Sequence, residues 1–406
     1  MTAVAITGLG SVASCGHGRG ALELALRESR VDLVEIDRDR GFHLAASARH
    51  AARAAVTDLS PWLAPAASRR MSPPSRLAAA AARMALEDAN LAMSPGAEDR
   101  CAVFLATGYG PSSYTERILE QVIREGPSSA SPMLFTESVA NAPAAQVALL
   151  ERATGANVTV TQLEAGALHA VARGAQELVS GRADRVLAGA VEELSPLLHA
   201  ILDRYHALVR PGRGGEVARP FDRRRSGYVA GEGAAVLVLE RAADAAARGA
   251  ETLANLEGWS RAFDPSAPPS GWGERPERTA AALKRRLERA GFDLGTTDLI
   301  VSGANGSRRG DRAAGLVLRS AFRGATLPPV VTPAAMLGAF CGNTLGAAVL
   351  AARGAGFGPT PGFEEIDPDL GIRPHDGSPL PLPRRVLVES TATGGAAVWL
   401  ALGRPA

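Results

Sequence analysis

Strand-like apolar runs alternate with Ala-rich helical runs along the chain, and this alternation constrains the fold more than any other feature. In the first half, apolar runs at residues 4–9 and 100–107 lie on either side of a long helical pattern at 75–90. The other predicted elements are helices at 20–28, 114–124, 277–290 and 343–353, and strands at 186–190, 234–239, 253–259, 299–302, 385–389 and 396–402. This alternation predicts an α/β fold with mostly parallel sheets, covered by helices on both faces.

The composition indicates a large globular protein and argues against several kinds of partner. A chain of 406 residues predicts about two or three domain-sized units. A hydrophobic content of 46% supplies a large core, while 44 basic and 42 acidic residues leave a net charge of +2. This balance argues against binding to nucleic acid and against a polybasic membrane surface. Because the sequence has no signal-peptide pattern and no apolar stretch of about 18 residues, we expect a cytoplasmic protein without a membrane span.

The three cysteines, Cys15, Cys101 and Cys341, are odd in number and widely spaced. Their spacing fits neither a disulfide framework nor a zinc site, so we predict buried free thiols and no bound metal. For Cys341 a reactive thiol is the alternative interpretation.

Residues 157–169 read N-V-T-V-T-Q-L-E-A-G-A-L-H, which predicts a strand, a sharp turn and the start of an Ala-rich helix that continues to Leu178. A helix N-terminus at such a turn lowers the pKa of a thiol and directs backbone N–H groups toward a developing oxyanion. Here the residue at the turn is Glu164 instead of a cysteine. The helix dipole favours its carboxylate form and burial favours its neutral form, so the sequence leaves its protonation state open.

Several segments share the pattern of one family: residues 4–12, 126–132, 138–144, 180–184 and 186–192. The most specific segment is 220–234, P-F-D-R-R-R-S-G-Y-V-A-G-E-G-A, which runs into an apolar strand at 236–240. Together these segments resemble the ketosynthases of fatty-acid and polyketide synthesis. The resemblance implies a dimer and a thiolase-like, five-layered αβαβα fold of two similar halves, at residues 1–245 and 246–406.

The catalytic groups that the resemblance implies are missing from this sequence. A condensing ketosynthase uses a cysteine for the acyl chain, two histidines, and a lysine that supports one of them. Glu164 stands at the cysteine position, and the first histidine position falls on Gly303 or Ala304. In the loop 334–339, alanine stands at both the lysine and the second histidine positions, and Thr393 replaces the phenylalanine of the gating loop.

A count of residue types supports the same conclusion. The seven histidines are at positions 17, 43, 50, 169, 199, 206 and 375, so only His375 lies in the second half. Lys284, within a charged helical pattern, is the one lysine of the chain. A pair of catalytic histidines with a supporting lysine therefore cannot be assembled in the second half.

The candidate catalytic residues are Glu164, Asn305 and Thr393. Glu164 either fills the former acyl site and caps the helix, or acts as a general acid or base or as a mimic of a charged acyl group. Asn305 could orient a carbonyl group, and the N–H groups of Glu164 and Thr393 could form an oxyanion hole. The alternative is that Asn305, Ser307 and Thr393 only satisfy their own turns. The candidate substrate-binding residues are Gly303, Ala339, Gly394 and Gly395.

Other residues have a docking or a structural interpretation. Arg210 and Arg213, in the basic run 204–225, are candidates for docking an acidic acyl carrier protein, and a solvated loop is the alternative. His169 is interpreted as a packed helix residue. The following residues of the most specific segment are interpreted as architecture: Phe221, Asp222, Gly227, Gly231, Glu232 and Gly233.

The resemblance favours a non-condensing subunit similar to the chain length factors of type II polyketide synthases. Such a subunit forms a heterodimer with a Cys-bearing ketosynthase, needs no cofactor of its own, and meets substrates carried on the phosphopantetheine of acyl carrier protein. Chain length factors commonly have Gln at the nucleophile position, whereas this chain has Glu164. The alternative is a homodimeric enzyme that uses Glu164 for cyclisation, dehydration or acyl transfer.

Overall fold

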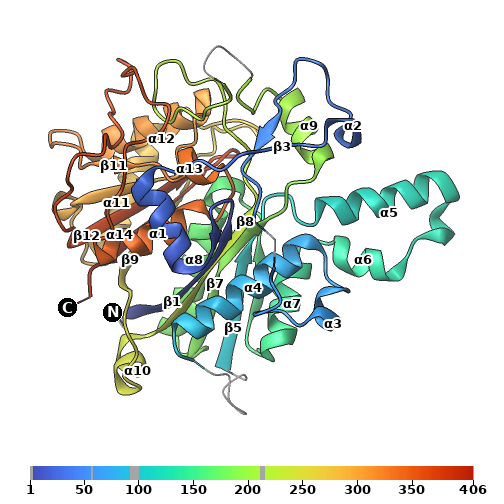
Figure 1. Ribbon diagram of the computed structural model, residues 1–406. Helices are drawn as coiled ribbons and strands as arrows, with labels where there is room; N and C mark the ends of the chain where they lie inside the picture. The colour runs from blue at the N-terminus through green and yellow to red at the C-terminus, as the bar shows by residue number, and fades with distance from the viewer. Residues whose placement is uncertain (1–2, 56–57, 92–99, 211–214, 406) are drawn as a thin grey trace.

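The computed structural model describes residues 3–55, 58–91, 100–210 and 215–405 (Figure 1). Its main sheet contains two successive sets of five strands. The first set is β1 (Val4–Ala13), β5 (Cys101–Ala106), β6 (Asn157–Val160), β7 (Arg185–Glu192) and β8 (Gly233–Arg241). The second set is β9 (Ala254–Phe263), β10 (Leu299–Ser302), β11 (Val330–Val331), β12 (Arg385–Thr391) and β13 (Ala396–Gly403).

The two sets repeat one topology. Their spatial orders are β6-β5-β7-β8-β1 and β11-β10-β12-β13-β9. In the first set β5 pairs in parallel with β6 and β7, and β8 pairs antiparallel with β7 and β1. In the second set β10 pairs in parallel with β11 and β12, and β13 pairs antiparallel with β12 and β9. The prediction of two similar halves is therefore confirmed. The expected boundary at residue 245 falls within α10 (Ala242–Ala247), between the two sets.

The expectation of mostly parallel sheets is wrong. β7 and β8 are antiparallel, as are β8 and β1, and the second set repeats both relations. Antiparallel neighbours form when the chain leaves and returns at the same end of a sheet. The turn 392–395 does this between β12 and β13, and the long excursion 193–232 does it between β7 and β8. A helix within a connection, such as α9 (Pro196–Arg204), therefore does not guarantee parallel strands.

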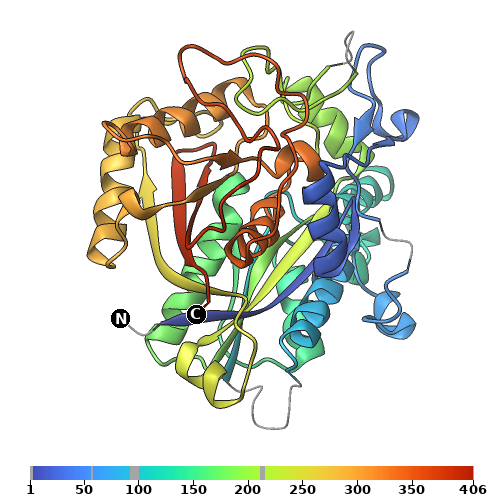
Figure 2. The same cartoon turned by 60° about the vertical axis from the view of Figure 1, so that its left-hand side comes forward.

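Three apolar clusters separate five layers (Figures 1 and 2). The middle cluster holds α8 (Gly166–Val179) and α14 (Asn343–Arg353) between the two sets of strands. The outer layers are α4 (Pro73–Asp88) with α7 (Ala142–Glu151), and α11 (Pro276–Arg289) with α12 (Arg308–Ala321). Successive residues of a strand face opposite layers: Val398 and Leu400 of β13 join the middle cluster, whereas Trp399 joins an outer one.

Small residues allow β1 and α4 to pack closely. A Cβ atom added at Gly10 would lie 1.9 Å from the carbonyl oxygen of Ala81, so only glycine fits there. The facing side of α4 is a run of buried alanines. At the other end of the fold, Val4 and Leu402 both pair with Leu256 of β9, so the two termini lie close together (Figure 2).

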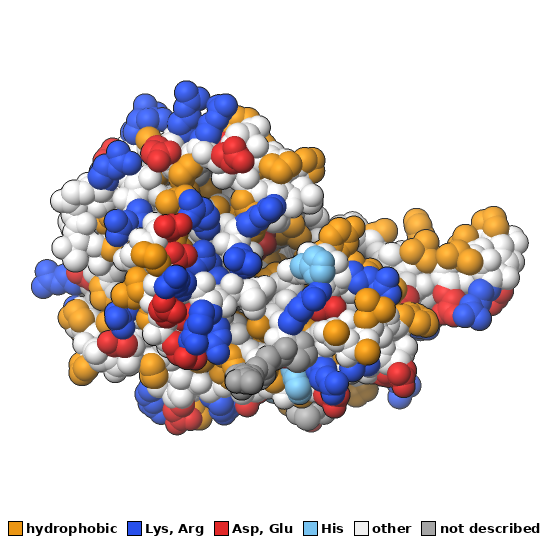
Figure 3. Space-filling view, turned by 90° about the horizontal axis from the view of Figure 1, so that it is seen from above, with side chains coloured by type: hydrophobic (Ala, Val, Ile, Leu, Met, Phe, Trp, Pro, Cys, Tyr) orange, Lys and Arg blue, Asp and Glu red, His pale blue; other side chains and the backbone are white. Residues whose placement is uncertain are grey.

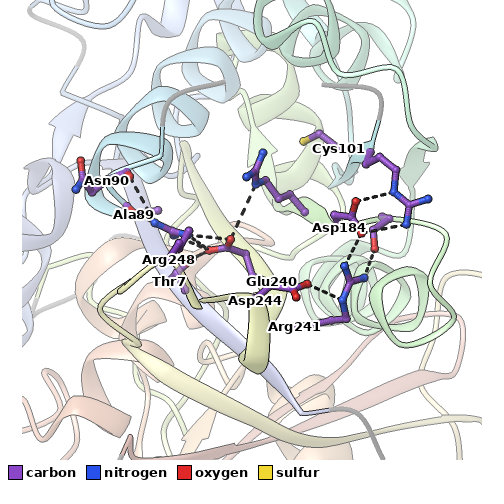
Figure 4. A network of polar contacts seen from close by, with 12 residues as sticks. Thr7, Ala89, Asn90, Cys101, Asp184, Glu240, Arg241, Asp244 and Arg248 are labelled. Atoms are coloured by element: carbon purple, nitrogen blue, oxygen red, sulfur yellow. Dashed lines mark hydrogen bonds and ion pairs between the residues drawn. The ribbon is translucent and has the colours of Figure 1, made fainter. Parts of the chain in front are cut away.

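A network of ion pairs holds β1, β8 and α10 together (Figure 4). The side chain of Glu240 is only 2% exposed and contacts Arg248 at 2.6 Å. The hydroxyl group of Thr7 donates to the same carboxylate at 2.7 Å. Arg241 contacts Asp184, which lies just before β7. The connection between the two halves is thus anchored to the first set of strands.

Two helices project from the body as an arm, residues 112–138, built from α5 (Ser112–Glu125) and α6 (Pro132–Ser138) (Figure 1). The sequence predicts an apolar face on α5 with Ile118, Leu119 and Val122. Ile118 is buried, but Leu119 is 53% exposed. The predicted face is only partly covered because α5 packs against α6 and extends beyond the central sheet.

The remaining elements are short or lie at the periphery. They are α1 (Gly18–Glu28), α2 (Arg38–Gly41), α3 (Pro65–Ser68), α13 (Ala334–Leu337), β2 (Gly16–His17), β3 (Val34–Glu35), β4 (His50–Ala51), and the 3₁₀ turns Pro127–Ser129, Leu163–Ala165 and Leu294–Thr296. Among the described helices, none has both the length and the apolar character needed to cross a membrane.

Candidate functional site

The predicted strand–turn–helix around Glu164 is present. β6 ends at Val160, a 3₁₀ turn spans Leu163–Ala165, and α8 begins at Gly166. Leu163 has a φ of 40°, a left-handed conformation that makes the turn sharp and costs a non-glycine residue about 1 kcal/mol or more. The hydroxyl group of Ser390 donates to the carbonyl oxygen of Glu164 at 2.7 Å. The end of β12 is thereby fastened to the elbow.

The carboxylate of Glu164 occupies the predicted oxyanion hole. Its Oε2 atom accepts hydrogen bonds from the N–H group of Thr393 at 3.2 Å and from the Thr393 hydroxyl at 3.3 Å. The backbone N–H group of Glu164 also interacts with this carboxylate. Burial raises the pKa of Glu164, and the hydrogen bonds from these donors only partly offset that effect. The N–H group of Thr393, one of the two expected to hold an oxyanion, thus already has an acceptor.

A cavity of about 50 Å³ lies beside the elbow. It is lined by the predicted site residues Glu164, Gly303, Asn305 and Ala339. The other lining residues are Gly108, Tyr109, Leu163, Glu192, Glu193, Leu194, Leu198, Leu202, Tyr228, Ala230, Gly231, Phe340, Cys341 and Asn343. A space of this size holds a few water molecules and is too small for an extended acyl chain.

Two of the predicted substrate-binding residues lie elsewhere. The N–H group of Gly394 donates to the carbonyl oxygen of Gly271 at 2.8 Å. The carbonyl oxygen of Gly395 accepts from the N–H group of Asp264, also at 2.8 Å. Both glycines therefore hold the loop after β9, and neither is among the residues that line the cavity.

Asn305 and Ser307 satisfy their own turns, as the alternative interpretation expects. The Oδ1 atom of Asn305 accepts from the N–H group of Ser307 at 3.0 Å. The hydroxyl of Ser307 accepts from the N–H group of Gly310 at 3.2 Å and caps α12. Asn305 nevertheless lines the cavity, so it keeps a position beside Glu164.

A second carboxyl group, that of Glu192, lines the cavity and was not among the predicted site residues. It accepts hydrogen bonds from the hydroxyl of Thr107 at 3.0 Å and from the N–H groups of Gly108 and Tyr109 at 2.7 and 3.0 Å. Burial is the main effect on this group and raises its pKa to about 7. Its position at the end of a predicted strand gave no signal, because its hydrogen-bond partners lie 83–85 residues earlier in the chain, at the turn after β5.

Cys341 lies against Glu192, and its environment argues against a reactive thiol. Burial raises the pKa of Cys341 well above its ordinary value, and the neighbouring Glu192 raises it further. Burial also raises the pKa of Cys15 to about 11 and that of Cys101 to about 12. All three cysteines are buried and unpaired, as predicted.

Among the described residues, neither a histidine nor a lysine lines this cavity. His375 is buried elsewhere, with Nε2 3.0 Å from the carbonyl oxygen of Phe357. Lys284 lies on α11, 3.9 Å from Glu288. The first-half residue His169 contacts Gln162 and Arg261 on the far side of the elbow. Within the described ranges, no group of three or more His, Cys, Asp or Glu residues is arranged to hold a metal ion.

The segment 220–234 fastens loops to the body. Asp222 accepts from the N–H groups of Glu364 and Glu365, both at 2.7 Å. Glu232 accepts from the N–H groups of Ala54 and Leu194, both at 3.2 Å. These two buried carboxylates therefore hold neighbouring loops in place, which fits the structural interpretation of the segment.

Most arginines of the basic run already have acidic partners. The pairs are Arg219 with Glu364, Arg223 with Glu365, Arg224 with Glu364, and Arg225 with Asp367. The docking candidate Arg210 is exposed and contacts His206 Nδ1 at 2.6 Å, whereas Arg213 lies outside the described residues. The surface formed by the basic run therefore carries much less net positive charge than its sequence suggests.

Comparisons with known proteins agree with this architecture. A family model for the beta-ketoacyl synthase N-terminal domain matches residues 1–245. The chain is 31% identical over 350 residues to 3-oxoacyl-(acyl-carrier-protein) synthase 2 of Mycobacterium tuberculosis, covering 83% of this chain and 82% of that protein. It is 29% identical over 408 residues to a putative polyketide beta-ketoacyl synthase 2 of Streptomyces halstedii, covering 99% and 97%.

Among solved structures, the ishigamide ketosynthase/chain length factor matches with a TM-score of 0.89 and 28% identity, covering 100% of both chains. A beta-ketoacyl synthase from Burkholderia phymatum matches with a TM-score of 0.87 at 24% identity and 100% coverage of both, which shows the shared fold. Sequence, topology and elbow geometry lead to one conclusion: this chain belongs to the beta-ketoacyl synthase family.

Proposed function

We propose that this chain is a non-condensing subunit of the chain length factor type. It pairs with a Cys-bearing ketosynthase in the cytoplasm and shapes the site in which an acyl or polyketide chain grows on acyl carrier protein. The observation that carries the proposal is the hydrogen bonding of the Glu164 carboxylate to Thr393. A carboxylate in this position excludes the acyl oxygen that a condensing enzyme must hold there.

The projecting arm supports a pairing function. Its exposed apolar side chains are Leu119, Ile123, Met133 and Phe135, with exposed fractions of 53%, 80%, 59% and 60%. Figure 3 shows hydrophobic side chains gathered along this arm, away from the body. Contiguous exposed apolar surface of this kind is typical of protein–protein contacts. The similarity to the ishigamide ketosynthase/chain length factor favours a ketosynthase as the partner.

One observation favours a second function, an enzyme that uses Glu164. Glu164 and Glu192 line the same cavity, and burial raises the pKa of both, that of Glu192 to about 7, which favours the protonated form that a general acid needs. The volume of about 50 Å³ limits this function to a substrate group of a few atoms, unless the elbow opens. The first function needs no such opening.

The test is co-expression with a Cys-bearing ketosynthase encoded beside this chain, followed by native mass spectrometry. We expect a 1:1 heterodimer, and low solubility of this chain when it is expressed alone. A soluble homodimer of about twice 41.9 kDa with no affinity for that ketosynthase would exclude the proposed pairing.

The variant Glu164→Gln separates the two functions. Glutamine keeps the shape of the side chain and one acceptor oxygen, but it cannot exchange a proton. A partner subunit with Glu164→Gln supports product formation by the heterodimer at the wild-type rate. An enzyme that depends on proton transfer by Glu164 loses its activity with the same change.

A further inference from the structure

A second and larger cavity lies beyond the elbow, over the end of β9. Its volume is about 640 Å³, within the range of small-molecule sites. Four arginines line it: Arg261 on β9, Arg275 just before α11, and Arg278 and Arg286 on α11. The whole protein carries a net charge of only +2, so this is a marked local concentration of positive charge.

The charge of Arg275 helps to lower the pKa of Asp264, whereas the other three arginines have no acidic partner in the described part of the chain. None of the four forms an ion pair there, unlike the arginines of the basic run. Asp264 is the one carboxylate among the lining residues, and it already accepts hydrogen bonds from Ser266 and from the N–H group of Arg275. Burial, followed by the charges of Arg173 and Arg286, lowers the pKa of Arg261. The cavity thus holds the charges of three arginines that no described carboxylate compensates.

His169 holds Arg261 in place and connects it to the elbow. The Nη1 atom of Arg261 lies 2.9 Å from His169 Nε2, and a guanidinium group can only donate, so Nε2 is unprotonated. The proton therefore resides on Nδ1, which donates to Gln162 Oε1 at 2.5 Å. Burial, and then Arg261 and Arg173, lower the pKa of His169 to about 4, which keeps it neutral at pH 7. Arg261 is thus fixed toward the cavity by an uncharged partner.

We propose that this arginine-lined cavity binds the phosphate group of a phosphomonoester. Guanidinium groups match phosphate oxygens in pairs, and several arginines around one cavity suit a dianion better than a single carboxylate. Because Gln162 precedes the elbow by two residues, a ligand on Arg261 would be linked to the elbow through His169 and Gln162. This site is separate from the Glu164 cavity and does not depend on the proposed subunit function.

The experiment is isothermal titration calorimetry of the full chain, in the assembly in which it purifies, at 150 mM salt. The probes are 4′-phosphopantetheine and adenosine 3′,5′-bisphosphate, with pantetheine and adenosine as their phosphate-free counterparts. We expect each phosphorylated probe that binds to do so at least tenfold more tightly than its counterpart. Tighter binding of the first probe assigns the phosphate to a free pantetheine phosphate, and tighter binding of the second assigns it to a nucleotide.

Three variants keep this test specific. Arg261→Gln and Arg278→Gln should each weaken binding about tenfold or more, because each removes a charged hydrogen bond to phosphate. Arg278 is exposed, so its replacement leaves folding intact even if Arg261→Gln destabilises the protein. Arg289→Gln is the matched control, since it lies on the same helix but does not line the cavity. Equal binding of phosphorylated and phosphate-free probes, or an equal loss in the Arg289 control, would overturn the proposal.

Discussion

The side chain of Glu164 competes with any substrate for the donors at the elbow. Its Oε2 atom lies 3.2 Å from the N–H nitrogen of Thr393 and 3.3 Å from the Thr393 hydroxyl. An acyl carbonyl could use these donors only after the carboxylate moved away. Breaking each hydrogen bond costs about 1 kcal/mol when the Glu164 carboxyl group is neutral and about 1.5–3 kcal/mol when it is ionised. The residue at the turn therefore blocks the chemistry that the turn geometry would otherwise support.

The variant Glu164→Cys tests how much of the condensing machinery remains. It returns a thiol to the elbow and frees the N–H groups, so we expect iodoacetamide to label residue 164 at pH 8. We expect no condensation with acyl- and malonyl-carrier proteins, because no histidine or lysine of the described chain lines the adjoining cavity. Product above the background of the wild-type protein would show that another residue supplies the missing proton transfers.

The arm makes a prediction at the scale of an element. Ile123→Asp and Phe135→Asp place a charge in the apolar surface of α5 and α6, where the two side chains are 80% and 60% exposed. We expect each to weaken the heterodimer at least tenfold in native mass spectrometry titrations, without a change in thermal stability. Leu382→Asp is the matched control, because Leu382 is 58% exposed but lies in the loop before β12. Loss of pairing in the control alone would place the interface elsewhere.

The ion pairs at α10 make a second prediction at this scale. Arg248→Ala leaves Glu240, whose side chain is 2% exposed, with one partner fewer. We expect a loss of about 3 kcal/mol in the free energy of unfolding in urea at pH 7. Arg353→Ala breaks a pair with Glu251, which is 57% exposed, and should cost less than about 1 kcal/mol. Similar losses in both variants would contradict a special role for burial.

The elements were predictable from local pattern, whereas their arrangement and the site depended on long-range contacts. The helix Asn343–Arg353 and the strand Leu299–Ser302 have the predicted bounds, because each is a continuous run of small or apolar residues with the length typical of its element. The antiparallel pairing of β7 with β8 follows from the path of the long connection 193–232. That path produces no periodic pattern of apolar residues from which the strand direction could be predicted. Glu192 meets Tyr109 only because β7 pairs with β5. Glu164 was found because its strand, turn and helix are contiguous in sequence.

Buried ionisable groups act on the stability of the whole molecule. Burial raises the pKa of Glu192 and Glu389 to about 7 and that of Asp311 to about 6. Burial lowers the pKa of His169 and His199 to about 4. Compared with the unfolded chain, the folded state therefore holds more protons on these carboxyl groups up to about pH 7. It holds fewer protons on these two histidines between pH 4 and 6.5. The two effects oppose each other below pH 6.5, and only the carboxyl effect remains above it.

We therefore expect the free energy of unfolding to fall between pH 6.5 and 8, as the buried carboxyl groups lose protons that they retain more strongly when folded. Glu389 should contribute about 1 kcal/mol to this decline. In Glu389→Gln the amide can still accept from Ser302, and its NH₂ group replaces an oxygen that has no partner. The decline measured by urea unfolding should be smaller in this variant, and unchanged in the control Glu251→Gln, whose pKa is lowered by its contact with Arg353. Parallel pH profiles for the wild type and Glu389→Gln would mean that the Glu389 carboxyl stays in one protonation state across this range.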